Sequence, residues 1–146
     1  MFSFNLKSCK SLIFVALFLM TVINGSNSFA ANICTDGLKE LNSSQGVIHD
    51  KGGIWGYLEK SQSLRSESLT GLQMDGKLQR LISIFEDLCS EGKIPTASLH
   101  NQILSLLGDT RMIFNRDGDQ RKKEPFMKNL KELNKKIDKL LAKLPR

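Results

Sequence analysis

Cysteine is the most reactive residue type in this chain of 146 residues, and the positions of its three cysteines predict a disulfide. Cys9 lies in an N-terminal segment that we expect to be removed, which leaves Cys34 and Cys89. In an oxidising compartment, two remaining cysteines most simply bond to each other, and the chain has no CxxC motif that would indicate a redox-active thiol. We therefore predict a Cys34–Cys89 disulfide, which would stabilise the fold by about 4 kcal/mol on the chain-entropy account.

The chain also contains two sets of side chains that could instead bind a metal ion. If the cysteines were reduced, Cys34, Cys89 and His100 would offer the thiolate and imidazole ligands that zinc prefers. Thioethers suit Cu(I), and the helices predicted below would bring three of them to a similar height: Met74, Met112 and Met127. Methionine also commonly fills gaps in protein cores. We therefore expect no metal or other cofactor, and a metal- or cofactor-binding bundle is the first alternative function.

No arrangement of residues predicts catalysis. The chain lacks the nucleophile-elbow, HExxH, phosphate-binding and haem-attachment motifs. Its two histidines are His49 and His100, and His49 precedes Asp50 in a glycine-rich segment, where such a pair is more typical of a turn than of a catalytic dyad. We therefore expect a protein without enzymatic activity.

The glycine-rich segment GVIHDKGGIWGY contains the chain's only tryptophan and its only tyrosine. Four glycines in this segment predict a mobile loop over residues 46–56, with a short hairpin as an alternative. Because aromatic residues lead interface hot spots, we single out Trp55, Tyr57 and His49 as a candidate contact surface. The alternative is that Trp55 caps the end of the fold.

Basic residues gather at the C-terminus. Residues 121–146 include 10 basic and 3 acidic residues, a net charge of +7, whereas residues 31–120 have a net charge of −3. In residues 125–144, the apolar side chains fill an arc of about 100° of a helix, which is typical of a helix docked on a core. The opposite side of this helix contains six lysines: Lys128, Lys131, Lys135, Lys136, Lys139 and Lys143.

A docked helix of this kind would present its lysines to a binding partner. We predict an acidic protein, or an anionic polysaccharide or lipid surface, with Lys131, Lys135 and Lys139 as the contacts. A second alternative is a helix that lies on an anionic membrane, as cationic amphipathic helices do. Nucleic acid is disfavoured, because the band of lysines contains no aromatic residue on which bases could stack.

Helical periodicity predicts the elements that position these residues. Apolar residues between Leu78 and Cys89 share one helix face, with a capping-box pattern at residues 70–73 and a C-terminal end at Gly92 and Pro95. A second helix begins at Pro95 and ends at residues 117–119. Its inner side is predicted to consist of Leu99, Ile103, Leu106, Leu107, Thr110, Ile113 and Phe114.

Two weaker helical patterns, over residues 34–45 and 55–69, precede these helices. Connections of about 4 to 8 residues predict that consecutive helices run antiparallel. The sequence therefore predicts an all-α fold, a small up-and-down bundle of four to five helices.

The first 30 residues have the pattern of a cleaved signal peptide. Lys7 and Lys10 precede an uncharged run over residues 12–23, and small residues at Ser28 and Ala30 precede a cleavage site before residue 31. The run is shorter than the ~20 apolar residues that a spanning helix needs. We therefore expect residues 31–146 to form a single domain that is exported, either periplasmic or secreted, without a transmembrane segment.

Overall fold

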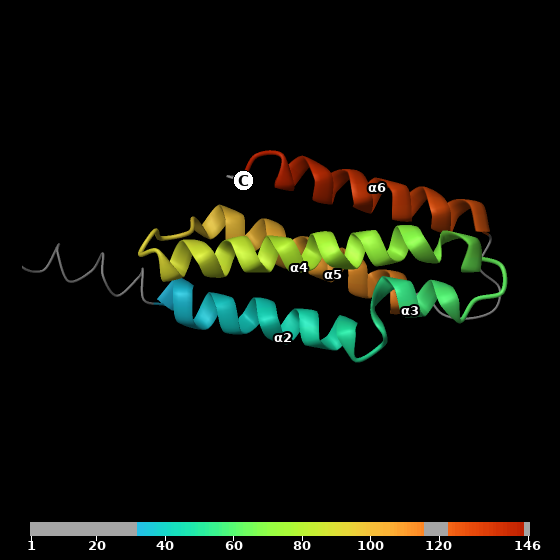
Figure 1. The fold of residues 1–146 in the computed structure, drawn as a ribbon, viewed down its shortest axis with the longest axis horizontal. Coiled ribbons are helices and arrows are strands. Elements are labelled where there is room, and N and C mark those ends of the chain that lie inside the picture. The colour runs from blue at the N-terminus through green and yellow to red at the C-terminus, as the bar shows by residue number, and fades with distance from the viewer. Residues whose placement is uncertain (1–31, 116–122, 145–146) are drawn as a thin grey trace, which may run out of the picture. The chain divides into compact units, whose positions relative to one another are not determined.

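The computed structural model describes residues 32–115 and 123–144, and over these residues it contains helices and no strand (Figure 1). The elements are a π-helix η1 (Ile33–Gly37), α2 (Leu38–His49), α3 (Gly53–Glu59), a 3₁₀-helix η2 (Arg65–Glu67), α4 (Ser68–Ser90), α5 (Ala97–Asn115) and α6 (Lys123–Leu141). The predicted all-α bundle is confirmed. The predicted signal peptide of residues 1–30 lies outside the described residues.

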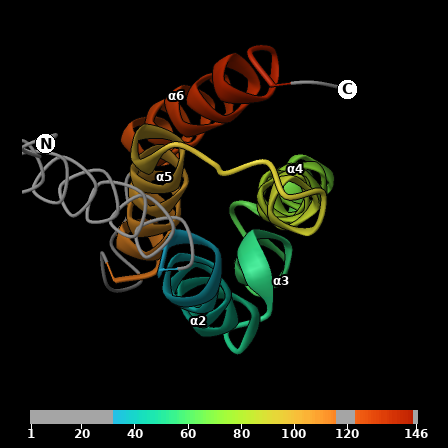
Figure 2. The ribbon, with the colours of Figure 1, turned by 90° about the vertical axis from the view of Figure 1, so that its left-hand side faces the viewer.

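Consecutive helices run in opposite directions, as predicted, with α2 and α3 together forming the first arm (Figure 1). Seen end-on, α6 lies on one side of the pair α4 and α5, and α2 and α3 lie on the other side (Figure 2). The connection over residues 91–96 therefore crosses the bundle from α4 to α5. As a result, α6 packs on α5, which runs antiparallel to it, and on α4, which runs parallel to it.

Each helix contributes one apolar face to a shared core. The large side chains that are fully buried come from α2, α3, α4, α5 and α6: Leu41, Ile54, Leu58, Met74, Leu81, Ile82, Phe85, Ile103, Leu107, Leu130 and Ile137. The predicted inner side of α5 is confirmed from Leu99 to Ile113, and the side chain of Phe114 lies outside the described residues. Burial of this apolar surface is the main force that holds the helices together.

The apolar stripe of α6 faces this core, as predicted. Phe126, Leu130, Leu133, Ile137 and Leu140 are buried, and the six lysines on the opposite side are all exposed. The leucines of α6 therefore point into the bundle, while its lysines point into the solvent.

Two helix ends follow the predicted signals. Gly92 has φ +70°, and the N–H groups of Gly92 and Lys93 bond to the carbonyls of Cys89 and Leu88, at 3.1 and 2.8 Å. This pair of bonds is a Schellman motif, which requires a left-handed residue and so favours glycine. At the start of α5, the Oγ1 atom of Thr96 accepts a hydrogen bond from the N–H of Leu99 at 3.1 Å, as an N-cap residue does.

Two predictions about the N-terminal half are wrong. Residues 46–49 continue α2 and residues 53–59 form α3, so the predicted loop or hairpin reduces to a turn in which Gly52 and Gly53 have φ +86° and +70°. The predicted helix over residues 55–69 ends at Glu59, and α4 begins at Ser68, so Thr70 lies inside the helix and forms no cap. The single turn of η2 leads the chain into α4 earlier than the capping-box pattern indicated.

Candidate functional site

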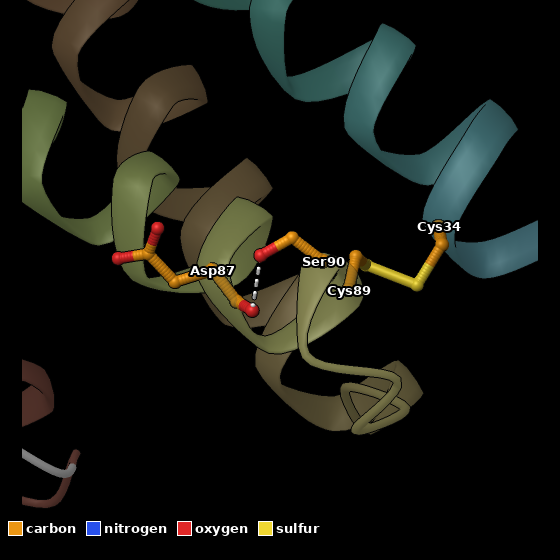
Figure 3. Close-up of a disulfide and its surroundings, with 4 residues drawn as sticks. All are labelled: Cys34, Asp87, Cys89 and Ser90. Carbon is orange, nitrogen blue, oxygen red and sulfur yellow. Dashed lines mark hydrogen bonds between the residues drawn. A yellow bond between two sulfur atoms is a disulfide. The ribbon is translucent and has the colours of Figure 1, made fainter.

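The disulfide between Cys34 and Cys89 is formed, as predicted (Figure 3). Its Cα atoms lie 5.6 Å apart, and it connects η1 to the last turn of α4. Beside it, Ser90 donates a hydrogen bond from its hydroxyl to the carbonyl oxygen of Asp87 at 2.9 Å. Because the two sulfurs are bonded to each other, neither is the thiolate that a zinc site would need.

His100, the third member of that zinc hypothesis, packs between helices. Its Nε2 atom lies 3.4 Å from the carboxylate of Glu40, and its ring centroid lies 5.9 Å from that of Phe85. A methyl group at Gly37 would lie 3.2 Å from the imidazole, so the glycine makes room for the ring. Among the described residues, no three His, Cys, Asp or Glu side chains are placed to hold a metal ion.

The three methionines of the Cu(I) hypothesis lie in different environments. Met74 is fully buried in the core, Met127 is partly buried, and Met112 is 55% exposed. A Cu(I) site needs its thioethers to converge on one ion. Met112 instead lines a surface groove to which Met74 does not contribute.

The predicted contact surface of His49, Trp55 and Tyr57 is divided between two helices and two environments. His49 ends α2, and the two aromatic residues lie in α3. Trp55 is 44% exposed, whereas Tyr57 is partly buried and its ring stacks on Phe126 with the centroids 5.9 Å apart. Residues two positions apart on a helix point about 200° apart. Tyr57 therefore packs against the end of the bundle, and the contact role of His49, Trp55 and Tyr57 stays a prediction.

A carboxylate that the sequence analysis did not single out organises this region. Asp75 of α4 accepts hydrogen bonds from the backbone N–H groups of Ile54 and Trp55, both at 2.9 Å. Because α3 has no side-chain cap of its own, Asp75 supplies the cap from another helix. Burial raises the pKa of the Asp75 carboxyl, and the two N–H donors and the nearby His49 limit the rise. The sequence signal would have been Gly71 and Asp75, a small residue and an acid one turn apart.

Polar contacts fix α6 on both flanks. On the α4 side, the Nζ atom of Lys77 donates to the Oδ1 atom of Asn134 at 2.9 Å and lies 2.6 Å from the carboxylate of Asp138. On the α5 side, the Nζ atom of Lys136 donates to the carboxylate of Asp109 at 2.8 Å. This bond raises the pKa of Lys136. The apolar stripe of α6, together with the contacts of Lys77 and Lys136, therefore sets how α6 is rotated on the bundle.

The three lysines predicted to contact a partner are all exposed, but they lie in two different places. Lys131 and Lys135 face the solvent, whereas Lys139 lies at the edge of α6 that faces α5. None of the three forms an ion pair within the described helices. Lys143, one turn beyond Lys139, is likewise exposed and unpaired there.

A groove runs along the seam between α5 and α6. It consists of three adjoining hollows of about 190, 320 and 310 Å³. The first and second share Asp109 and Lys136, and the second and third share Gln102, Leu140 and Lys143. The three hollows therefore adjoin one another along the seam, with the ion pair of Lys136 and Asp109 between the first two, and we call them together the α5–α6 groove.

The lining of the α5–α6 groove changes along its length. One end combines apolar and polar side chains. Its apolar residues are Met112, Ile113, Phe126 and Leu133, and its polar ones are Asp109, Asn129, Glu132 and Lys136. The other end is largely apolar, with Ile94, Leu99 and Leu144. Between them, three lysines line the groove: Lys136 and Lys139 of α6, and Lys143 in the turn that follows α6. The groove can therefore accept apolar groups at both ends and negative charge in the middle.

Comparison of the chain with protein-family models, with curated proteins and with solved structures found no match. Across residues 32–115 and 123–144, no helix is long and apolar enough to cross a membrane.

Proposed function

We propose that this protein is an exported, non-enzymatic binding protein whose helix α6 holds a basic face toward an acidic partner protein. The observation that supports this most directly is the division of α6: its apolar stripe is buried, yet six lysines remain exposed on its outer side. Like charges on one helix face repel one another. Most of these lysines form no ion pair within the described helices, so the bundle itself gives no reason for the cluster.

Export is part of the proposal and rests on the signal-peptide pattern of residues 1–30. The Cys34–Cys89 disulfide agrees with it, because such bonds persist mainly in oxidising compartments. A protein bound in that compartment by charge would be released by salt, since exposed charges are screened over about 8–10 Å at ordinary ionic strength.

Retention on immobilised poly-glutamate tests the basic face. Replacing Lys131, Lys135 and Lys139 together with alanine should weaken binding roughly 3- to 100-fold, because each exposed ion pair contributes about 0.2–1 kcal/mol. The matched control replaces the same three residues with arginine, which keeps the charge and should keep the retention. Unchanged retention of the alanine variant would contradict the proposal. Stronger binding to anionic phospholipid vesicles than to poly-glutamate would favour the membrane-surface alternative.

A further inference from the structure

We infer that the α5–α6 groove binds an acidic amphipathic helix of a partner protein. This inference rests on the proposed function, because it places the acidic partner along one edge of the basic face of α6. It also goes further, because it specifies the shape of the bound segment and the residues that hold it.

The charges in the middle hollow favour an acidic ligand, because its acid, Asp109, is already paired, and the other acid of the groove, Glu132, lines only the first hollow. Lys136 is already held by Asp109 at 2.8 Å. Lys139, near the end of α6, and Lys143, in the turn that follows it, form no ion pair with any residue that the structure describes. Two carboxylates of a partner, about one turn apart on a helix, would match this spacing. The groove therefore has room for two new ion pairs at its centre.

Both ends of the groove carry apolar side chains that the bundle leaves exposed. Met112 is 55% exposed at one end, and Ile94 is 56% exposed at the other. Methionine is flexible and polarisable, and it is frequent on surfaces that accept varied apolar partners. A ligand that covers these two residues would gain hydrophobic stabilisation that the free protein lacks.

Along the groove, apolar groups lie at both ends and basic groups lie between them. This order fits an amphipathic helix better than a small molecule or a lipid. The hollows, at about 190 to 320 Å³, lie at or below the lower limit of about 300–1,000 Å³ for small-molecule sites, so they suit single side chains. A lipid has its charge at one end and would leave one apolar end of the groove uncovered. An amphipathic helix has apolar anchors at i, i+3, i+4 and i+7 with acids beside them. Over the stretch from Phe126 to Leu144, about 27 Å at 1.5 Å per residue, such a helix reaches both ends.

The test uses a fluorescein-labelled peptide with leucines on one helix face and glutamates elsewhere, long enough to span the groove. Its binding to the disulfide-bonded protein is followed by fluorescence anisotropy. Lys139→Glu with Lys143→Glu should raise the Kd about 10-fold or more, because two attractions become repulsions. The matched control, Lys128→Glu with Lys131→Glu, makes the same change of charge in α6 at two lysines that line none of the three hollows. It should raise the Kd by about 3-fold or less, because these charges do not contact the hollows and are screened by salt.

A third variant, Met112→Ser, tests the apolar end. Met112 is exposed, so the melting temperature should stay unchanged while the peptide binds about 5-fold more weakly, as loss of a contact at an apolar anchor predicts. A peptide of the same composition in scrambled order, which has no apolar face, should bind more weakly than the amphipathic one.

The outcomes separate this inference from the proposed function. Equal weakening by the two lysine pairs would overturn the groove inference and leave the basic-face proposal standing. Failure of the peptide to bind saturably, with retention on poly-glutamate intact, would also overturn the groove inference alone. Absence of binding to both probes would contradict both. Binding to anionic vesicles that Lys139→Glu with Lys143→Glu abolishes, without peptide binding, would make lipid the occupant and overturn the inference. Dimerisation of the protein through this face would also overturn the inference, because a second copy of the chain would then occupy the groove.

Discussion

Two residues of α4 position α3 on the bundle. At Gly71, a Cβ atom would lie 2.8 Å from the Cδ1 atom of Leu58 and 2.9 Å from the backbone nitrogen of Trp55. One turn later, the carboxylate of Asp75 accepts the N–H groups of Ile54 and Trp55. Because Gly71 has no side chain, α3 can approach α4 closely. The carboxylate of Asp75 then fixes the position along α4 at which α3 begins.

We predict that Gly71→Ala destabilises the protein although alanine is the better helix former. Helix propensity favours the substitution by about 1 kcal/mol. The new methyl group would collide with the backbone of α3, however, and overpacking of this kind costs about 1–3 kcal/mol. The control is Gly76→Ala in the same helix, where a Cβ atom would meet nothing within 4 Å and the position is exposed. Urea unfolding followed by circular dichroism should show a loss for the first variant and a gain for the second; equal gains would contradict the close packing.

Among the elements, α6 has the strongest amphipathic pattern, and no disulfide joins it to the rest of the described bundle. It is held by its apolar stripe and by the contacts of Lys77 and Lys136. The disulfide, by contrast, ties η1 to α4 and does not reach α6. The position of the basic face therefore depends on the apolar packing of α6 and on these polar contacts.

We predict that leucine and lysine substitutions in α6 have very different effects on stability. Leu133 and Ile137 are 3% and 0% exposed. Replacing either with alanine should lower the free energy of unfolding by about 2–5 kcal/mol, because it removes buried methyl groups and leaves a cavity. Lys135→Ala and Lys139→Ala, at exposed positions, should change it by no more than about 0.5 kcal/mol. If Leu133→Ala leaves the melting temperature unchanged, α6 does not dock on the bundle.

The elements that could be predicted from the sequence are those in which the helical pattern of apolar residues continues over several turns. Residues such as Leu130 and Ile137 recur every turn, and one buried face dictates that recurrence. The break between α2 and α3 was mispredicted because four glycines looked like a loop. Only Gly52 and Gly53 form the turn, while Gly46 and Gly56 are helical. The cap from Asp75 was not predicted because it joins residues about twenty positions apart. Gly71 and Asp75 mark a place on α4 where another segment can approach, but they do not say which segment does so.

At the scale of the whole molecule, the α5–α6 groove depends on the order in which the helices pack. Packing of α6 against both α4 and α5 places Lys136, Lys139 and Lys143 beside α5, and Lys131 and Lys135 toward solvent. The helical wheel of α6 distinguishes its apolar from its basic side but does not say which lysines adjoin a neighbour. The sequence therefore predicted the basic face, whereas the groove along its edge required the packing of the bundle.

The last prediction concerns the disulfide, which fastens the beginning of the bundle to the end of its longest helix. Cys34 and Cys89 are 55 positions apart, so their bond closes a long loop. Cys34→Ser with Cys89→Ser should lower the free energy of unfolding by about 4 kcal/mol, because the unfolded chain regains the conformational freedom that the bond removes. Urea titrations of the non-reduced protein and of the variant measure this loss, and addition of a reductant to the wild type should reproduce it. Since α2 packs on both η1 and α4, the variant should keep its helical circular dichroism in the absence of urea. Detection of free thiols at Cys34 and Cys89 in the non-reduced protein would contradict the disulfide.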